Sequence, residues 1–120
     1  MVYGNTEEKD MRWELEKTVT IAASHTLRYG ECAKLHGHNW KIIARCSSDE
    51  LNGDGMVVDF NSIKFVVSTF DHCHLNDHEM FTEDYPPTAE NFARHICNAT
   101  PNCDSVTVYE GENSKVTYYR

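Results

Sequence analysis

The order of polar and apolar residues predicts an α+β domain in which two helices cover one face of an antiparallel sheet. Two long segments in the N-terminal half alternate with a period of two, as half-buried strands do, and two short segments near the C-terminus repeat this pattern. Between them lie two segments with apolar residues at helical spacing. The order β-β-α-α-β-β gives four strands and two open sheet edges, which favours pairing between copies of the chain.

Residues 11–25 form the first predicted strand, and its apolar parity extends to His25. The other residues of that parity are Trp13, Leu15, Val19, Ile21 and Ala23, with Lys17 as the polar exception. A short loop leads to the second predicted strand, residues 36–46, which therefore pairs with the first in an antiparallel sense. Its inward residues are His36, His38, Trp40, Ile42, Ala44 and Cys46.

The turn residues of the segment 47–55 separate these strands from the first predicted helix. Asp59 or Asn61 is placed to cap that helix, whose apolar stripe is Phe60, Ile63, Val67 and Phe70. Thr88 follows two prolines as the N-cap of a second helix, with Ala89, Phe92, Ala93 and Ile96 on its apolar stripe and Pro101 at its end.

Two short strands complete the predicted domain. Val106, Val108 and Glu110 share one parity, a turn covers residues 111–114, and residues 116–119 form the last strand. We therefore predict a single domain over residues 11–120, preceded by a flexible polar lead-in over residues 1–10.

Composition and charge limit the partners and the cellular location that we expect for the protein. A net charge of -8 disfavours nucleic acid or an anionic membrane as a partner, because both reward clustered Lys and Arg, whereas a small anionic molecule stays open. The sequence offers no apolar stretch of membrane-spanning length and no signal peptide at its start. Five cysteines without paired spacing indicate reduced thiols, and we expect a cytoplasmic protein.

Seven histidines are the unusual feature of the composition. His36 and His38 lie two apart on one strand and project from the same face, and His25 lies at the end of the neighbouring strand. Three imidazoles with one open position are typical of a catalytic zinc site. The alternative is a chance His-Gly-His pair beside one ordinary core histidine.

Three further groups carry candidate chemistry. Cys32 precedes His36 by four residues and is a candidate nucleophile or base, although an inert thiol or a fourth zinc ligand are alternatives. Asp71 beside His72 has the arrangement of a general acid or base, whereas His72, His74 and His78 would alternatively bind a second metal or belong to a polar loop. Glu110 ends an apolar strand face, where it suits the paired N–H donors of a guanidine-like ring edge, or simply reaches water.

Taken in order, six motifs resemble the 6-pyruvoyl-tetrahydropterin synthase family over residues 13–119. They are Ile21-Ala22-Ala23-Ser24-His25, Cys32-Ala33-Lys34-Leu35-His36-Gly37-His38, Val58-Asp59-Phe60, Asp71-His72-Cys73-His74-Leu75-Asn76, Pro87-Thr88-Ala89-Glu90-Asn91 and Val108-Tyr109-Glu110. The spacing of three residues between Cys32 and His36 is similar to that in the 6-carboxy-tetrahydropterin synthase branch of queuosine and deazapurine biosynthesis. Ile21, Ser24 and Gly111 depart from the residues common in the family.

This resemblance implies a tunnelling fold, a trimer or a dimer of trimers, and active sites between subunits. It implies one zinc ion per chain held by His25, His36 and His38, with Cys32 as the proton-abstracting base. Asp71 and His72 would transfer the opposite proton, and Glu110 would hold the pterin with help from Thr88. Lys17 and Arg28 are the candidate cations for a triphosphate.

The implied reaction converts 7,8-dihydroneopterin triphosphate to 6-carboxy-5,6,7,8-tetrahydropterin, with release of acetaldehyde and triphosphate. Zinc would polarise the oxygens of the substrate's side chain. A 6-pyruvoyl-tetrahydropterin synthase, which eliminates triphosphate and keeps the carbon–carbon bond, is the alternative enzyme. A catalytically silent pterin-binding or zinc-binding module is the alternative outside enzymes.

Overall fold

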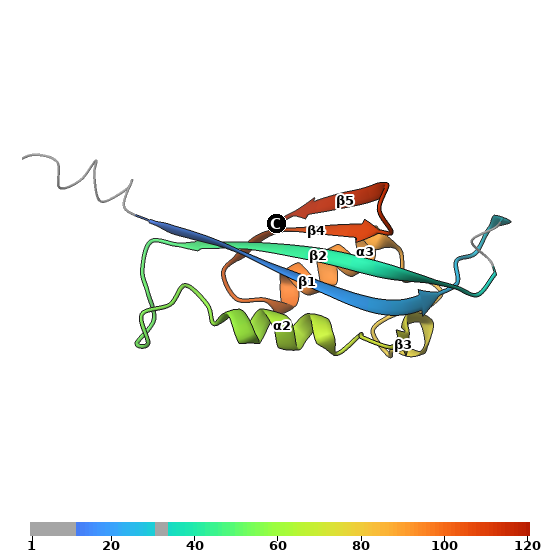
Figure 1. The fold of residues 1–120 in the computed structure, drawn as a ribbon, viewed down its shortest axis with the longest axis horizontal. Helices are drawn as coiled ribbons and strands as arrows, with labels where there is room; N and C mark the ends of the chain where they lie inside the picture. Colours follow the sequence, from blue (N-terminus) through green and yellow to red (C-terminus); the bar gives the residue numbers. More distant parts are fainter. Residues whose placement is uncertain (1–11, 31–33) are drawn as a thin grey trace, which may run out of the picture.

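The computed structural model of the protein describes residues 12–30 and 34–120. Its two long strands, β1 (Trp13–His25) and β2 (His36–Ser48), pair without interruption from Trp13 opposite Ser48 to His25 opposite His36. This register confirms that the apolar parity of β1 carries His25, and it places the three histidines at the same end of the hairpin. The two strands form a long, curved ribbon that the other elements cover only in part (Figure 1).

The C-terminal strands β4 (Cys103–Glu110) and β5 (Ser114–Tyr119) extend the sheet beyond β2, both in antiparallel pairing. The last strand begins two residues before the predicted start. A fifth strand, β3 (Cys73–His74), pairs in parallel with Ala23 and Ser24 on the other side of β1. The predicted four-stranded antiparallel sheet is thus wrong by this one short strand, and the sheet order is β3-β1-β2-β4-β5.

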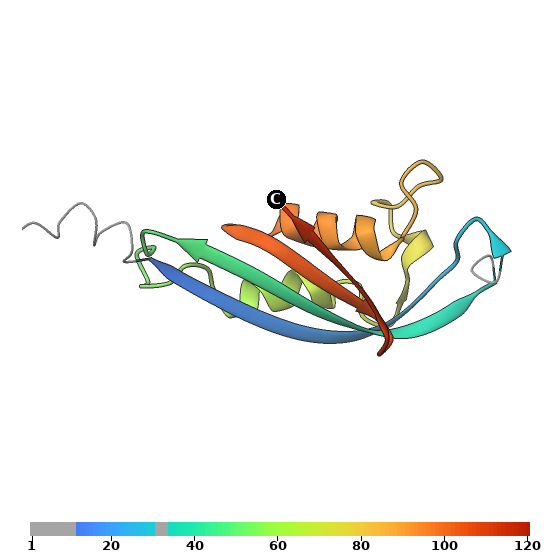
Figure 2. The ribbon, with the colours of Figure 1, turned by 90° about the horizontal axis from the view of Figure 1, so that it is seen from above.

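Two helices, α2 (Phe60–Ser68) and α3 (Ala89–Ala99), lie on the same face of the sheet (Figure 2). Asp59 caps α2 by accepting from the Asn61 N–H, and Thr88 caps α3 by accepting from the Asn91 N–H, because both helix starts leave backbone donors without partners. A short 3-10 helix, η2 (Leu75–Asp77), follows β3. Within the described part of the chain, no helix is long and apolar enough to cross a membrane.

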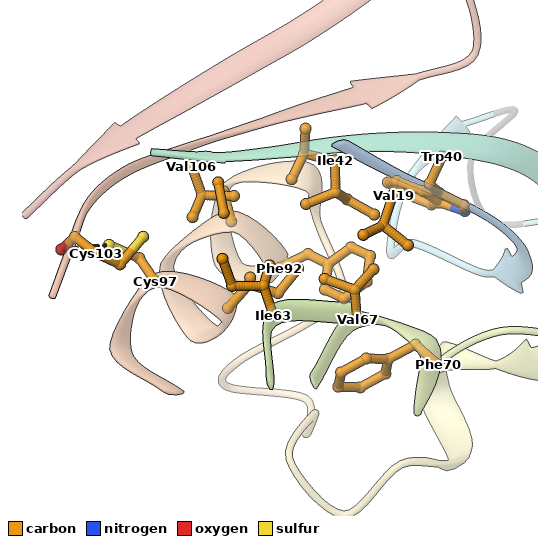
Figure 3. Close-up of a cluster of buried hydrophobic side chains, with 14 of the residues drawn as sticks. Val19, Trp40, Ile42, Ile63, Val67, Phe70, Phe92, Cys97, Cys103 and Val106 are labelled. Carbon is orange, nitrogen blue, oxygen red and sulfur yellow. Dashed lines mark hydrogen bonds between the residues drawn. The ribbon is translucent and has the colours of Figure 1, made fainter. Parts of the chain in front are cut away.

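The apolar core fills the space between the helices and the inner face of the sheet (Figure 3). Ile63, Val67 and Phe70 are buried as their spacing predicts, but Phe60, the first residue of α2, is half exposed, so its predicted place on the apolar stripe is wrong. Trp40 and Phe92 pack edge to face with 5.5 Å between ring centroids. Trp40 is fully buried between this core and the histidines, so the core continues directly into the candidate site.

Candidate metal centre

Four side chains converge where β1, β2 and β4 come together at one end of the inner sheet face. Ligand atoms of His25, His36, His38 and Glu110 all lie within 4.8 Å of one another. The ladder brings them together because His25 pairs with His36, and Glu110 pairs with Trp40, two residues beyond His38. Strand residues two apart share a face, so every member of the cluster points inward. The sequence prediction that the three histidines form one site is consistent with this arrangement.

Backbone carbonyls fix the orientation of two of these rings. Nδ1 of His25 donates to the carbonyl of Pro87 over 2.9 Å, and Nδ1 of His36 donates to the carbonyl of Lys34 over 2.6 Å. Because a carbonyl can only accept, each Nδ1 carries the proton and each Nε2 of the neutral ring presents a lone pair. An outer partner of this kind is typical of metal-binding histidines, since it sets both tautomer and ring direction.

Burial keeps the central histidine neutral. His25 is 0% exposed, and this burial lowers its pKa below the ordinary value, against the opposing effects of the Pro87 carbonyl and the Glu110 carboxylate. The neighbouring His36 and His38 lower the pKa further. A neutral imidazole is the form that binds a metal ion.

The unpaired nitrogens of the cluster test whether it suits a metal. Nε2 of His25 and Nε2 of His38 are buried, and neither makes a hydrogen bond. Buried polar atoms without partners are rare, because each costs about 1–3 kcal/mol. Three imidazole nitrogens beside one carboxylate are a donor set that zinc accepts readily. The residues therefore fit a metal ion, with His25, His36 and His38 as its nitrogen ligands.

The Asp71–His72 pair lies elsewhere on the sheet. The Asp71 carboxylate accepts from the Ala22 N–H over 2.9 Å, and the His72 N–H donates to the Ala22 carbonyl. Nδ1 of His72 lies 3.1 Å from the Asp71 carboxylate, yet the imidazole is 83% exposed. The Ala22 N–H, and then His72, lower the pKa of Asp71, so the carboxylate is ionised at neutral pH.

His72 faces a shallow hollow on the side of the sheet that the helices leave open. Ala22, Ser24, Gly37 and Asn39, all of outward parity, line this hollow together with Ala23 and His38. The backbone of His72 has φ of 59°, a conformation unusual for a histidine and typical of functional or tightly constrained positions. Within one chain, the predicted acid–base pair is thus separated by the sheet from the buried face of the metal centre.

The remaining predicted residues occupy varied positions. Cys32 lies outside the described residues. The Thr88 hydroxyl accepts the capping N–H of Asn91 over 3.1 Å. Arg28 donates to the Glu83 carbonyl over 2.7 Å. Lys17 precedes His25 by eight residues along β1, about 26 Å at the usual strand rise, so it does not join the site of its own chain.

The alternative of a second metal at His72, His74 and His78 is wrong, because among the described residues the cluster with Glu110 is the only group of three or more His, Cys, Asp or Glu side chains close enough to share an ion. Nδ1 of His74 bonds the Ser24 hydroxyl over 2.9 Å, and the His78 ring packs on Phe70. Gly37, between His36 and His38, is not required by packing within the chain, because a Cβ there would meet only the Ala23 carbonyl oxygen at an ordinary 3.8 Å.

Two motif asparagines act in ways that sequence reasoning missed. Asn76 accepts from the Thr26 N–H and donates to the Thr26 carbonyl, which holds the chain directly after His25. Asn91 donates to the Pro86 carbonyl, next to the Pro87 carbonyl that orients His25. The only signal in the sequence was their place inside motifs, since a side-chain amide that binds backbone has no characteristic spacing.

Sheet order, helix placement and the histidine-carboxylate cluster around the buried His25 define the class: a protein of the tunnelling fold with a histidine-rich candidate metal centre. A sequence model described as "6-pyruvoyl tetrahydropterin synthase" matches residues 14–120. The chain belongs to this family, and its α+β tunnelling fold is as predicted.

Relatives and solved structures agree with this assignment. The chain is 33% identical to 6-carboxy-5,6,7,8-tetrahydropterin synthase of Bacillus subtilis, over 88% of this chain and 84% of that protein. It is 32% identical to the Synechocystis protein of the same name, over 89% and 93%. By fold it resembles the 6-pyruvoyl tetrahydropterin synthase of Caenorhabditis elegans, with a TM-score of 0.75, 22% identity, and coverage of 91% and 96%. The enzyme of that name from Plasmodium vivax has a TM-score of 0.60, 22% identity, and coverage of 91% and 98%.

Proposed function

We propose that the chain is a zinc-dependent 6-carboxy-5,6,7,8-tetrahydropterin synthase. It would convert 7,8-dihydroneopterin triphosphate to 6-carboxy-5,6,7,8-tetrahydropterin with release of acetaldehyde and triphosphate. The observation that carries the proposal is the convergence of three imidazoles whose ligand nitrogens lie within 4.8 Å of one another, in a chain whose relatives of about one-third identity bear this name. The four cysteines within the described residues are free thiols, which supports a cytoplasmic location.

The proposed division of labour rests on the family resemblance and, for the metal, on the convergence of the three histidines. Zinc, when bound, supplies Lewis-acid polarisation of the oxygens on the substrate's side chain. Cys32 removes a proton from that side chain, and the Asp71–His72 pair transfers the proton on its opposite side. Glu110 accepts the paired N–H groups of the pterin ring, and the Thr88 hydroxyl donates to it.

We further propose that the active enzyme is a homo-oligomer, a trimer or a dimer of trimers, in which sites form between copies. Two observations support this. The Asp71–His72 pair faces away from the buried side of its own metal centre, and the His72 ring is largely exposed. Among the residues that the structure describes, most of the outer β1 edge also lacks a partner strand, because β3 pairs only with Ala23 and Ser24.

Product analysis tests the activity. The zinc-loaded chain is incubated with 7,8-dihydroneopterin triphosphate, acetaldehyde is measured by a coupled alcohol dehydrogenase, and the pterin is identified by chromatography and mass. We expect one acetaldehyde per 6-carboxy product. A pyruvoyl product without acetaldehyde would make the chain a 6-pyruvoyl-tetrahydropterin synthase, and binding of the pterin without any product would make it a silent module.

The Cys32→Ala variant tests the proposed base. Removal of the thiol should abolish turnover, because the substrate's side chain then loses its proton acceptor, while zinc stays at one per chain by elemental analysis. Loss of zinc from this variant would instead make Cys32 a metal ligand and would close the fourth position of the site.

A further inference from the structure

The Glu110 carboxylate lies among the histidines in a way that a pterin anchor alone does not explain. Its Oε1 lies 3.2 Å from Nε2 of His38, and its Oε2 lies 3.7 Å from Nε2 of His25. Neither contact is a hydrogen bond, since both nitrogens are left without a hydrogen-bond partner. The two Glu110 oxygens therefore lie close to Nε2 of His38 and Nε2 of His25, and neither contact is bridged by a hydrogen bond.

The tautomers make this arrangement unfavourable for the chain alone. Nε2 of His25 presents a lone pair, because its Nδ1–H is given to the Pro87 carbonyl. A carboxylate oxygen opposite that lone pair is a second acceptor, and two acceptors facing each other repel. His25 is fully buried and Glu110 is 27% exposed, so water screens this repulsion only from one side. Such a pair is stable when a cation lies between its members.

The spacing suits shared coordination. Two ligand atoms at about 2.0–2.1 Å from zinc in tetrahedral geometry lie about 3.3 Å apart. The two Glu110 contacts of 3.2 and 3.7 Å bracket that value. All four candidate ligand atoms, one from each side chain, lie within 4.8 Å of one another.

We infer that Glu110 is the fourth ligand of the metal ion in the substrate-free protein. His25, His36 and His38 supply the nitrogens, and one Glu110 oxygen fills the position that would otherwise hold water. The inference concerns the resting site and does not depend on which substrate the enzyme takes.

A second consequence rests on the proposed function. A pterin ring edge would need both Glu110 oxygens for its two parallel N–H groups, and both oxygens face histidines in the free chain. Ring binding therefore withdraws Glu110 from the metal and opens the fourth position. Recognition of the ring and exposure of the metal become one event.

Cobalt(II) substitution tests the resting ligand, because its visible absorption reports the number and type of ligands. The full chain is stripped with a chelator and reloaded with Co²⁺, and the same is done for Glu110→Gln. We expect the variant to show shifted absorption bands and at least tenfold weaker Zn²⁺ binding in a competition titration with a chromophoric chelator. Unchanged bands with an affinity within twofold of the parent would overturn the inference.

The matched control is Glu90→Gln. Glu90 and Glu110 line one pocket at the start of α3, but Glu90 does not belong to the cluster, so its loss should leave spectrum and affinity unchanged. Circular dichroism verifies that both variants fold.

Thermal melting separates the inference from an ordinary His38–Glu110 ion pair. If Glu110 is a ligand, Glu110→Gln leaves the metal-free melting temperature equal or higher, because the acceptor repulsion is relieved, and it reduces the rise on adding Zn²⁺. If the contact is an ion pair, the metal-free variant melts lower and the rise is unchanged, which contradicts the inference.

Adding pterin to the Co²⁺ protein tests the second consequence. The absorption bands should move toward those of Glu110→Gln. Bands that do not move although pterin is bound would refute the release of Glu110 and leave its role as the resting ligand intact.

Discussion

The histidine cluster includes His25 of β1, and the Asp71–His72 pair bonds Ala22 three residues earlier on that strand, but the two regions are built in opposite ways. The cluster surrounds the fully buried His25, two of its three rings are oriented by backbone carbonyls, and it fits a metal within one chain. The pair is exposed and is fixed by bonds to the Ala22 backbone on the edge of the sheet. One region is complete in the single chain, whereas the other presents a side chain to something outside it.

This difference indicates how the two regions respond to change. The cluster shares its packing with the core through Trp40, so substitutions there should alter metal binding and stability together. His72 has little packing to lose, so its substitution should alter turnover alone.

The largest effect is expected at the buried histidine. His25→Ala removes one nitrogen ligand and leaves a cavity beside Trp40, so zinc affinity should fall at least 100-fold and turnover should be abolished. Elemental analysis after dialysis measures the zinc, and a variant that retains one zinc per chain would show that His25 is not a ligand.

The His72→Gln variant tests the exposed region of the comparison. Because the ring is exposed, zinc content and melting temperature should stay close to those of the parent, while kcat falls about 10²–10⁴-fold with the loss of an acid–base group. His74→Gln is the control, since His74 bonds Ser24 and carries no proposed chemistry. Equal losses in both variants would indicate a structural effect of this turn.

Trp40→Phe tests the link between core and cluster. The Trp40 indole N–H donates to the Ala23 carbonyl over 3.1 Å, and its ring packs on His25 and His38. Loss of this bond and of ring volume should cost about 2–3 kcal/mol of unfolding free energy and weaken zinc binding about tenfold. Phe92→Leu, a core change on the far side of Trp40, should destabilise the protein while zinc affinity stays unchanged.

The smallest effect is a pH dependence away from both regions. Burial, followed by the neighbouring His78, lowers the pKa of His95 from 6.5. Below pH 6.5 the unfolded chain therefore binds a proton that the folded chain refuses, so the free energy of unfolding falls as pH drops toward the folded pKa. Denaturant titrations between pH 7.5 and 5.5 should show a shallower fall for His95→Gln. If the free energy of unfolding falls with pH equally in the parent and in His95→Gln, groups other than His95 cause the pH dependence.

Alternation in the sequence was sufficient for the main strands and for one side of the site. Residues two apart on a strand must share a face, so His36, His38 and Trp40 were predictably together, and His25 and Glu110 were predictably inward. Helix caps at Asp59 and Thr88 were also predictable, because capping depends on neighbours a few residues away.

Strand β3 and the orientation of the acid–base pair were not predictable in this way. A two-residue strand is too short to show a period, and the clamp of Asp71 and His72 on Ala22 joins residues about fifty positions apart. The exposed half of Phe60 likewise depends on which face of α2 meets the sheet.

The sequence by itself determined which residue types share a strand face and where elements begin, because these follow from local geometry and short-range hydrogen bonds. The tertiary structure alone decided that Glu110 approaches the histidines, that Pro87 and Lys34 orient two of the rings, and that His72 is largely exposed. Each of these depends on strand register or on backbone groups distant in the chain, and side-chain patterns carry no record of either.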